Sequence, residues 1–167
     1  DRESRSGTAS RGALARAYAQ ATAPGSLPSA VILVDLDNLA AINASGGTST
    51  GDEVLRGVGV RLTEAFRESD LVARWRDDEF ALLLPATDVA TAKRLLARAQ
   101  AHLTTSTPTG PDGAERPVTF SAGIGVALPP MPLDAAIAAA DRALSLAKAS
   151  GPSTVRILNR RCCSSSV

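Results

Sequence analysis

The chain has 167 residues, of which 44% are hydrophobic and 3% are aromatic. This length suits one well-buried domain and is too short for two. With 18 basic and 17 acidic residues the net charge is only +1, so no overall field favours nucleic acid or an anionic membrane. The scarcity of aromatic side chains further disfavours single-stranded nucleic acid, which stacks on aromatic rings.

No apolar run approaches the roughly 20 residues needed to span a bilayer, and no signal segment opens the chain. We therefore expect a cytoplasmic domain without direct membrane contact, even if the parent protein is membrane-attached. Because the chain opens at Asp1 without a methionine, we also expect sensory or output domains outside it. His102 is the only histidine, which argues against a histidine-based catalytic triad.

The first expected elements follow a polar segment at the N-terminus. Good helix formers predict a helix over Ala13–Ala21, ended by Pro24-Gly25. An apolar run predicts a buried strand over Val31–Asp37, followed by a short helix, Asn38–Asn43, and a Gly/Ser/Thr-rich loop, Ala44–Thr50. Helical spacing then predicts a helix with one buried face, which carries Val54, Leu55, Val58, Leu62, Ala65 and Phe66.

A hairpin and a further helix are expected in the middle of the chain. Two apolar runs, Leu71–Ala73 and Phe80–Leu84, flank a polar, acidic turn and predict a β-hairpin. Thr87-Asp88 offers an N-cap for a helix that runs to about His102. A loop rich in Thr, Pro and Gly follows over Thr104–Arg116.

The last expected elements are a strand over Val118–Ala127, a helix with Asp134 as N-cap and Gly151-Pro152 as stop, and a short strand over Ser153–Leu158. The order strand, helix, helix, hairpin, helix, strand, helix, strand predicts an α/β (α+β) sandwich. Its central, mostly antiparallel sheet would be flanked by helices.

We divide the chain into an N-terminal polar segment with one helix (1–26), a folded domain (27–158) and a polar tail (159–167). The tail contains the only two cysteines, Cys162 and Cys163. They are adjacent, which prevents them from cross-linking distant elements, and we expect them to be reduced and solvated.

Carboxylates gather at two strand ends. Asp35 and Asp37 end the first strand, and Asp77, Asp78 and Glu79 lie at the hairpin turn. A magnesium ion on a nucleotide typically takes one or two carboxylates with phosphate oxygens and waters, and Asp35 and Asp78 are candidates for that pair. The two acidic strand ends therefore indicate a metal-phosphate site. The alternative is a set of hairpin carboxylates held by solvent and nearby arginines.

These segments, together with Asn43, Gly51-Asp52 and the run Val118–Gly125, closely resemble the GGDEF domain of diguanylate cyclases. The resemblance covers roughly Leu27–Leu158. It implies a nucleotidyl-cyclase-like fold and the condensation of two GTP into the bacterial second messenger cyclic di-GMP. In that family the reaction is carried out by a dimer that uses Mg²⁺ or Mn²⁺.

The resemblance also implies roles for individual residues. Asp35, Asp78 and the backbone carbonyl of Leu36 match the metal ligands of the family. Glu79 matches a residue proposed to help deprotonate the attacking ribose hydroxyl.

A guanine-binding pair and a phosphate-binding lysine are implied in the same way. Asn43 and Asp52 match the positions that bind guanine, and Lys148 is the cation that remains at the phosphate end. From their positions alone, Asn43 is equally suited to a helix C-cap and Asp52 to a helix N-terminus, where the dipole favours an acid.

The departures from the family pattern predict loss of activity. Arg76-Asp77 replaces the two glycines of the signature, where a left-handed turn would cost non-glycine residues roughly 1 kcal/mol each. The side chains also take room from phosphate and ribose, and the carboxylate of Asp77 would repel the triphosphate. Ala40 and Pro152 replace a lysine and an arginine that bind phosphate. Phosphoryl transfer needs such cations.

A second site resembles the inhibitory site of the family. Arg67 and Asp70 have the RxxD spacing at which cyclic di-GMP binds, and a gap-free count from Asp78 places Arg98 at the third position of that site. An arginine fork suits guanine edges and phosphates, while a carboxylate suits guanine N–H groups. The alternative is a surface Arg–Asp pair at a helix end, worth about 0–1 kcal/mol.

Three interpretations follow from this pattern. The first is a catalytically inactive GGDEF domain that binds cyclic di-GMP or GTP and regulates an attached domain or partner. The second is an active, Mg²⁺-dependent diguanylate cyclase that works as a homodimer. The third is a dimerisation domain that binds no nucleotide.

Overall fold

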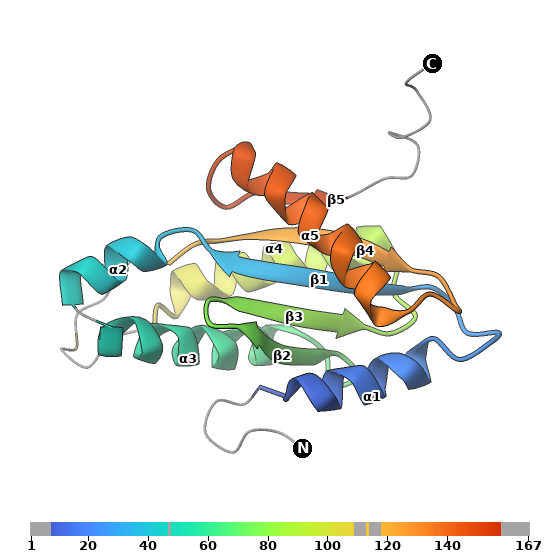
Figure 1. Ribbon diagram of the computed structural model, residues 1–167. Helices are drawn as coiled ribbons and strands as arrows, with labels where there is room; N and C mark the ends of the chain where they lie inside the picture. The colour runs from blue at the N-terminus through green and yellow to red at the C-terminus, as the bar shows by residue number, and fades with distance from the viewer. Residues whose placement is uncertain (1–7, 47, 109–112, 114–117, 158–167) are drawn as a thin grey trace.

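The computed structural model describes residues 8–46, 48–108, 113 and 118–157. A five-stranded sheet is covered by helices on both faces, which confirms the expected α/β sandwich (Figure 1). The strand order is β2-β3-β1-β4-β5, and all neighbouring strands are antiparallel except β4 and β5. The strands are β1 (Ser29–Leu36), β2 (Leu71–Arg76), β3 (Glu79–Leu84), β4 (Phe120–Ala127) and β5 (Val155–Ile157). The helices are α1 (Arg11–Ala21), α2 (Leu39–Gly46), α3 (Thr48–Ala65), α4 (Val89–Thr105) and α5 (Leu133–Ala149).

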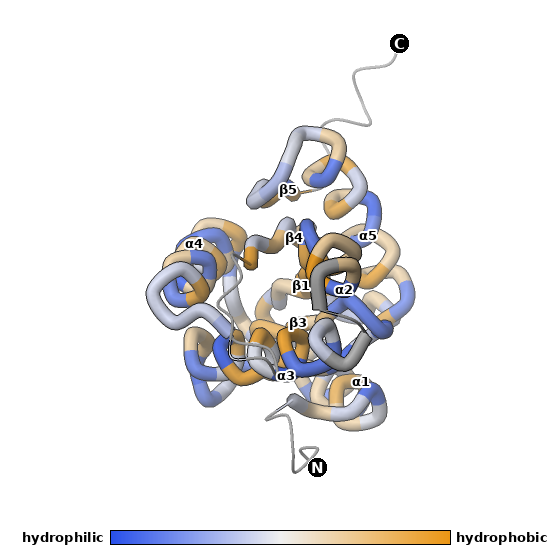
Figure 2. Tube along the Cα trace, turned by 90° about the vertical axis from the view of Figure 1, so that its left-hand side faces the viewer, coloured by the Kyte–Doolittle hydropathy of each residue, from blue (hydrophilic) through white to orange (hydrophobic). Residues whose placement is uncertain are grey.

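The sheet separates two hydrophobic cores. Ile32 and Val34 of the central strand β1 pack with residues of α3 and α4, whereas Val31 and Leu33 pack with residues of α1 and α5. Figure 2 shows the strands between α4 on one side and α5 on the other, with hydrophobic positions turned inward. Because β1 is buried on both faces, its sequence is continuously apolar rather than alternating. The alternation of side chains puts Asp35 on the face of α1 and α5.

Helix α1 belongs to the packed structure. Ser10 caps it by accepting a hydrogen bond from the backbone N–H of Ala13, and Leu14 and Tyr18 are buried in the core shared with α5. The hydroxyl of Tyr18 donates to the carbonyl of Met131 at 2.6 Å. The proposed boundary between 26 and 27 stays a prediction about domain organisation, but the helix itself covers the sheet.

Helices α2 and α3 replace the loop expected over 44–50, and that expectation is wrong for the described residues of the segment. Residues 44–46 end α2, and 48–50 begin α3. The two helices pack against each other, and Ile42, Thr50 and Val54 are buried. Burial of these residues outweighs the weak helix propensity of Gly, Ser and Thr, which had favoured a loop.

The signature hairpin closes without a left-handed residue, contrary to the strain expected at Arg76-Asp77. Among the described non-glycine residues, only Ala86 and Ser153 have positive φ. The β2–β3 register shifts between Arg74 and Arg76, so Trp75 is an extra residue on β2, and a turn at 77–78 leads into β3. A bulge increases the local twist of a hairpin. Arg76 and Asp77 are therefore accommodated with ordinary backbone angles.

The ends of the elements agree with expectation in one case and differ in two. Asp88 caps α4 as predicted, accepting a hydrogen bond from the N–H of Thr91 at 2.8 Å. Asp134 is not the N-cap of α5, because Pro132 occupies that position and Asp134 lies in the first turn, where the helix dipole favours an acid. Strand β5 begins only at Val155, after the left-handed Ser153.

Parts of the expected loop 104–116, and the tail with Cys162 and Cys163, lie outside the described residues. Within the described ranges, no helix combines the length and the hydropathy needed to cross a membrane.

Candidate functional site

The carboxylates of the two strand ends meet beside the C-terminal part of α5. Asp35 and Glu79 are direct cross-strand partners between β1 and β3, so their side chains leave the sheet on the same face. Lys148 reaches this point from the last turn of α5. Its Nζ lies 3.2 Å from Asp35 Oδ2, 3.4 Å from the carbonyl oxygen of Leu36 and 3.8 Å from Asp37 Oδ1.

Two of these carboxyls titrate above their ordinary range. Burial raises the pKa of Asp35, and the charges of Asp78 and Asp37 act in the same direction, while Lys148 opposes them. Burial also raises the pKa of Glu79, with the Asp35 charge as the next cause. Among the described residues, Glu79 Oε2 has no hydrogen-bond partner, and the nearest cation is Arg76, whose Nε lies 3.9 Å away. A buried carboxylate oxygen without a partner costs stability.

We expect Glu79→Gln to stabilise the domain by about 0.5–2 kcal/mol at neutral pH, because it removes a buried charge. Because the pKa of Glu79 is higher in the folded state than in the unfolded state, protonated Glu79 favours folding below the unfolded-state pKa. This contribution is lost as the pH rises through the folded-state pKa. The gain should therefore shrink as the pH falls toward the ordinary glutamate pKa. Urea unfolding between mildly acidic and neutral pH measures this trend. Glu68→Gln is the exposed control, and an equal gain there would contradict the account.

Asp37 has a structural role that the sequence did not reveal. Its carboxylate accepts hydrogen bonds from Thr119 Oγ1 at 2.7 Å, Ser121 Oγ at 2.6 Å and the N–H of Ser153 at 2.8 Å. It thereby joins the end of β1 to β4 and to the turn after α5. The Asp-x-Asp spacing could have indicated that Asp37 lies beside Asp35, because residues two apart lie on the same face of a strand.

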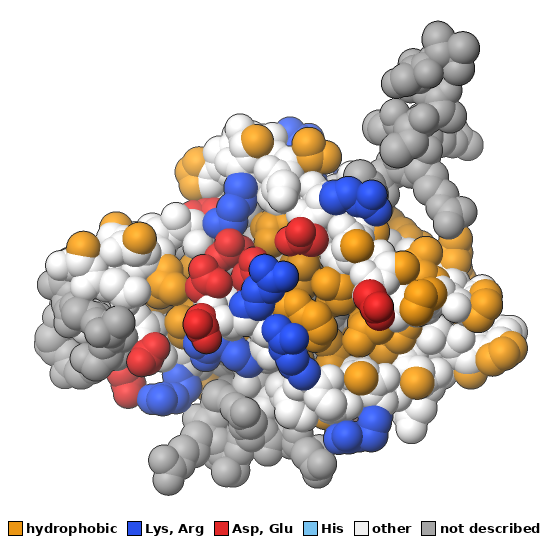
Figure 3. Space-filling view, viewed as in Figure 1, with side chains coloured by type: hydrophobic (Ala, Val, Ile, Leu, Met, Phe, Trp, Pro, Cys, Tyr) orange, Lys and Arg blue, Asp and Glu red, His pale blue; other side chains and the backbone are white. Residues whose placement is uncertain are grey.

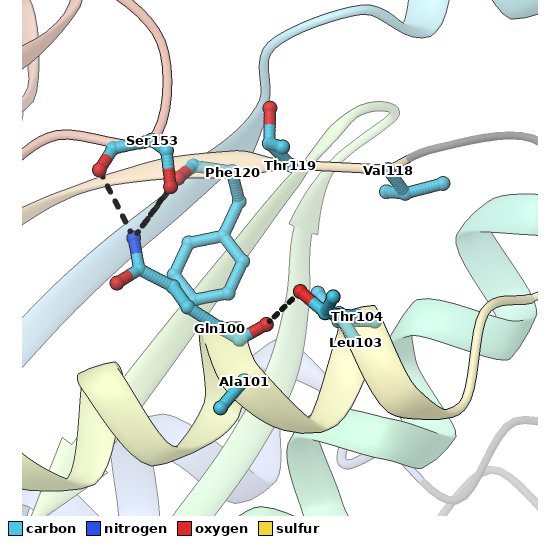
Figure 4. A pocket seen from close by; sticks show the side chains of 8 residues that line it. All are labelled: Gln100, Ala101, Leu103, Thr104, Val118, Thr119, Phe120 and Ser153. Carbon is cyan, nitrogen blue, oxygen red and sulfur yellow. Dashed lines mark hydrogen bonds between the residues drawn. The ribbon is translucent and has the colours of Figure 1, made fainter.

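Gln100 completes this connection from the opposite helix layer. Figure 4 shows its side chain extending from α4 toward β4 and the turn before β5. Gln100 Nε2 donates to the carbonyl and the hydroxyl of Ser153 at 3.3 Å each, and to the carbonyl of Phe120 at 3.4 Å. The adjoining cavity of about 160 Å³ is lined by Gln100, Ala101, Leu103, Thr104, Val118, Thr119, Phe120 and Ser153. Its polar side chains are hydrogen-bonded to protein groups, with Thr104 donating to the carbonyl of Gln100 and Thr119 to Asp37, which indicates a structural role.

Asn43 and Asp52 come from α2 and α3. A Cβ on Gly51 would lie 1.8 Å from Asn43 Oδ1, so a larger residue at position 51 would displace the asparagine side chain from this position. Asn43 Oδ1 is buried and has no hydrogen-bond partner within the described residues. Asp52, next to Gly51, is exposed. A buried amide oxygen without a partner beside an exposed carboxylate is compatible with a ligand that supplies donors to both.

The hairpin tip is held by two arginines. Arg74 Nη2 donates to the carbonyl of Asp77 at 2.6 Å, and Arg11 of α1 stacks 4.0 Å above the ring of Trp75 and donates to its carbonyl at 2.7 Å. The side chain of Arg76 is 63% exposed. Neither Arg11 nor Arg74 was assigned a role from the sequence, because both contacts depend on the folded hairpin.

An apolar hollow adjoins this tip. In Figure 3, acidic and basic side chains gather beside a hydrophobic depression on the face of α5. The hollow measures about 420 Å³ and is lined by Leu33, Trp75, Arg76, Leu133, Asp134, Ile137, Ala138 and Asp141. Arg76 thus borders the hollow and also lies nearest to Glu79.

The residues of the second predicted site are only partly brought together. Arg67 forms a forked ion pair with Asp70, with Nε–Oδ2 and Nη2–Oδ1 distances of 2.9 Å, and Arg67 Nη2 also donates to Thr87 Oγ1 at 2.6 Å. The hydrogen bond with Asp70 raises the pKa of Arg67. The Asp70 side chain is 0% exposed and that of Arg67 is 42% exposed. Arg98 is exposed on α4 and makes no hydrogen bond or ion pair within the described residues.

The oxygen donors at Asp35 do not fit a divalent cation while Lys148 is in place. Magnesium binds oxygens at about 2.0–2.1 Å in a nearly octahedral shell. Two of the three implied ligands, the carboxylate of Asp35 and the carbonyl of Leu36, already contact an ammonium group. In the part of the chain that the structure describes, no group of three or more His, Cys, Asp or Glu side chains is arranged to hold a metal.

The sequence model of the family described as "Diguanylate cyclase, GGDEF domain" matches residues 8–154. The chain belongs to the GGDEF family. It is 35% identical over 133 residues to the response regulator PleD of Caulobacter vibrioides, and this match covers 78% of this chain and 29% of PleD. It is 34% identical over 119 residues to the diguanylate cyclase DgcP of Pseudomonas aeruginosa, covering 71% of this chain and 18% of DgcP. This GGDEF domain therefore spans less than a third of the length of these curated relatives.

The fold agrees with this assignment. The GGDEF domain of TpbB (YfiN) from Pseudomonas aeruginosa superposes on the chain with a TM-score of 0.79 at 31% identity, covering 95% of both chains. Family membership and fold are thus established together, and residues 8–26, which include α1, lie inside the region that the family model matches.

Proposed function

We propose that this GGDEF domain is a regulatory module that binds a guanine nucleotide and does not make cyclic di-GMP. The observation that carries the proposal is that Lys148 is the only cation within 3.5 Å of the described carboxylates at the strand ends, and it is paired with Asp35. Ala40 and Pro152 bring no charge to the positions at which the family has further cations. Without them, the charge that develops on a transferring phosphoryl group stays unneutralised.

The leading ligand is cyclic di-GMP at Arg67, Asp70 and Arg98. The fork of Arg67 is held in a defined orientation by Asp70 and Thr87, and nearly half of its side chain stays open to solvent. Arg98 is exposed on α4. Two arginines with accessible donors suit the phosphates and guanine edges of this ligand. Because Asp70 is fully buried in its pair with Arg67, recognition of guanine by Asp70 requires that this pair opens.

Calorimetric titration with cyclic di-GMP tests this site, and Arg98→Ala is the informative variant. We expect the substitution to weaken binding by about tenfold or more, because it removes a charge-assisted contact. Arg94→Ala, an exposed arginine on the same helix, is the matched control and should bind as the wild type does. Absence of heat with the wild-type domain at high micromolar ligand would rule out this site.

Arg67→Ala should abolish binding as well, but it needs a folding control. Removal of the guanidinium leaves the buried carboxylate of Asp70 without its charged partner, and breaking such a pair costs roughly 3–5 kcal/mol in a fully buried setting. The partial exposure of Arg67 lowers this figure. Loss of ligand binding by Arg67→Ala therefore counts only if the variant retains a cooperative unfolding transition.

A second candidate ligand is GTP at Asn43 and Asp52. It is favoured by the buried, unpartnered oxygen of Asn43 and by the close fit of Asn43 against Gly51. Calorimetry with GTP, in EDTA and in Mg²⁺, distinguishes the two ligands, because Asp52→Ala should weaken GTP and leave cyclic di-GMP unaffected. A regulatory role would be exercised through domains attached to this chain or through a homodimer.

The two alternative interpretations make different predictions for the same experiments. An active cyclase, with Mg²⁺ or Mn²⁺ at Asp35, Leu36 and Asp78 and Glu79 as general base, would release cyclic di-GMP from GTP. A dimerisation domain without a ligand would bind neither nucleotide and would still self-associate.

A further inference from the structure

We infer that Lys148 is a built-in cation that occupies the position of the divalent metal in this domain and excludes the metal in the absence of nucleotide. The family resemblance gives Lys148 only a role toward the nucleotide. The contacts of its ammonium group are instead those expected of a cation that belongs to the carboxylate site itself.

The geometry supports this inference directly. Lys148 Nζ contacts both the carboxylate of Asp35, at 3.2 Å, and the carbonyl of Leu36, at 3.4 Å. These are the two implied metal ligands that come from β1. The third contact, to Asp37 Oδ1 at 3.8 Å, is longer, and the Asp37 carboxylate also accepts hydrogen bonds from Thr119, Ser121 and Ser153.

The backbone of Lys148 is fixed by the packing of α5, and its ammonium group lies against Asp35. Ala147, next to Lys148 on α5, is fully buried, and α5 is anchored on β4, the strand beside β1. The side chains of Lys148 and Asp35 are 35% and 16% exposed, so this ion pair is partly shielded from solvent. A divalent ion would have to displace the ammonium to reach either oxygen.

Thermal unfolding without nucleotide tests the inference. The wild type should unfold at the same temperature in EDTA and in millimolar Mn²⁺ or Mg²⁺ at matched ionic strength. Lys148→Met leaves Asp35 beside Asp78 and Glu79 without its cation, so the variant should unfold at a lower temperature in EDTA. It should regain on the order of 3 °C or more when Mn²⁺ is added.

Two controls assign the effect to this position. Lys93 is the only other lysine in the chain and is exposed on α4, so Lys93→Met should behave as the wild type does. Adding Asp35→Asn to Lys148→Met should abolish the gain from Mn²⁺. A metal-induced rise in the wild type equal to that of Lys148→Met would overturn the inference, as would the absence of any rise in the variant.

Direct Mn²⁺ binding keeps the test decisive if Lys148→Met does not fold in EDTA. Electron paramagnetic resonance counts bound Mn²⁺ on the wild type, which should bind none at this site. Bound Mn²⁺ that disappears in Asp35→Asn would overturn the inference. Failure of nucleotide binding leaves these outcomes unchanged, so they are separate from the test of the proposed function.

Discussion

Replacing Arg76 and Asp77 together with glycine is expected to raise the affinity for GTP by about tenfold or more, without producing cyclic di-GMP. Asp78 and Glu79 follow these residues directly, and Arg76 lies 3.9 Å from Glu79. Its side chain therefore covers the approach to the carboxylate, and Asp77 adds a charge that repels phosphate. Removing Arg76 gives back space and removing Asp77 removes the carboxylate that repels phosphate; a tenfold gain in affinity corresponds to about 1.4 kcal/mol.

A double alanine variant shows which property of glycine matters. Neither Arg76 nor Asp77 has a positive φ, so the hairpin itself does not require glycine. If the side chains are the obstruction, alanine at both positions should restore most of the GTP affinity. If only glycine restores it, the bound state needs a left-handed backbone that alanine resists. A folded double glycine variant with unchanged affinity would contradict the account altogether.

Turnover should need more than an open hairpin. The wild type is expected to form no cyclic di-GMP from GTP with Mg²⁺ or Mn²⁺, as measured by chromatography. Product should appear only when the double glycine variant also carries Ala40→Lys and Pro152→Arg, because these restore cations at the phosphates. Both positions are exposed, so the substitutions leave the core intact. Product above background from the wild type would instead support the active cyclase.

The substitution Gly123→Ala is expected to destabilise the domain by about 3 kcal/mol or more. Gly123 lies in β4 under α5, and a Cβ at this position would lie 2.2 Å from the carbonyl oxygen of Ala140 and 2.2 Å from the backbone N of Leu144. Both obstacles are backbone atoms of a helix, so they cannot move aside singly. The whole helix would have to shift, and Lys148 would shift with it away from Asp35.

Urea unfolding measures the loss, and Gly12→Ala is the matched control. A Cβ on Gly12 would come no closer than 3.4 Å to its neighbours, and the residue is exposed in α1. We expect its free energy of unfolding to stay within about 0.5 kcal/mol of the wild type. If Gly123→Ala is equally mild, helix α5 is less closely packed on β4 than the structure indicates.

Much of the fold could be predicted from local patterns. The apolar run before Asp35, the hairpin around Asp78 and the periodic helix after Asp52 are local features, and their order along the chain determines the sandwich. The predicted secondary structure was wrong where the local conformational propensity of the residues and their burial favour different structures. Residues 44–50 read as a loop by composition, yet helix packing around Ile42 and Val54 makes them helical on both sides of residue 47.

The candidate sites divide in the same way. The acidic strand ends and the resemblance to the GGDEF family together pointed to Asp35, Glu79 and the Arg67–Asp70 pair. In the structure Asp35 and Glu79 are cross-strand partners, and Arg67 forms an ion pair with Asp70. The burial and the hydrogen-bond partners of each group were not predictable from the sequence. The Asp70 side chain is fully buried, and Glu79 carries an unpartnered oxygen. Burial depends on which elements cover a residue, and motif spacing does not contain that information.

The sequence by itself determined the family, the order of the elements and the residues that can carry chemistry, because these depend on patterns a few residues long. Only the tertiary structure decided which partners those residues have. Lys148 meets the carbonyl of Leu36 across 112 positions of sequence, and Ser121 meets Asp37 across 84. Such pairs depend on how α5 and β4 pack against β1. The identity of the cation at Asp35 is therefore a property of the packed fold.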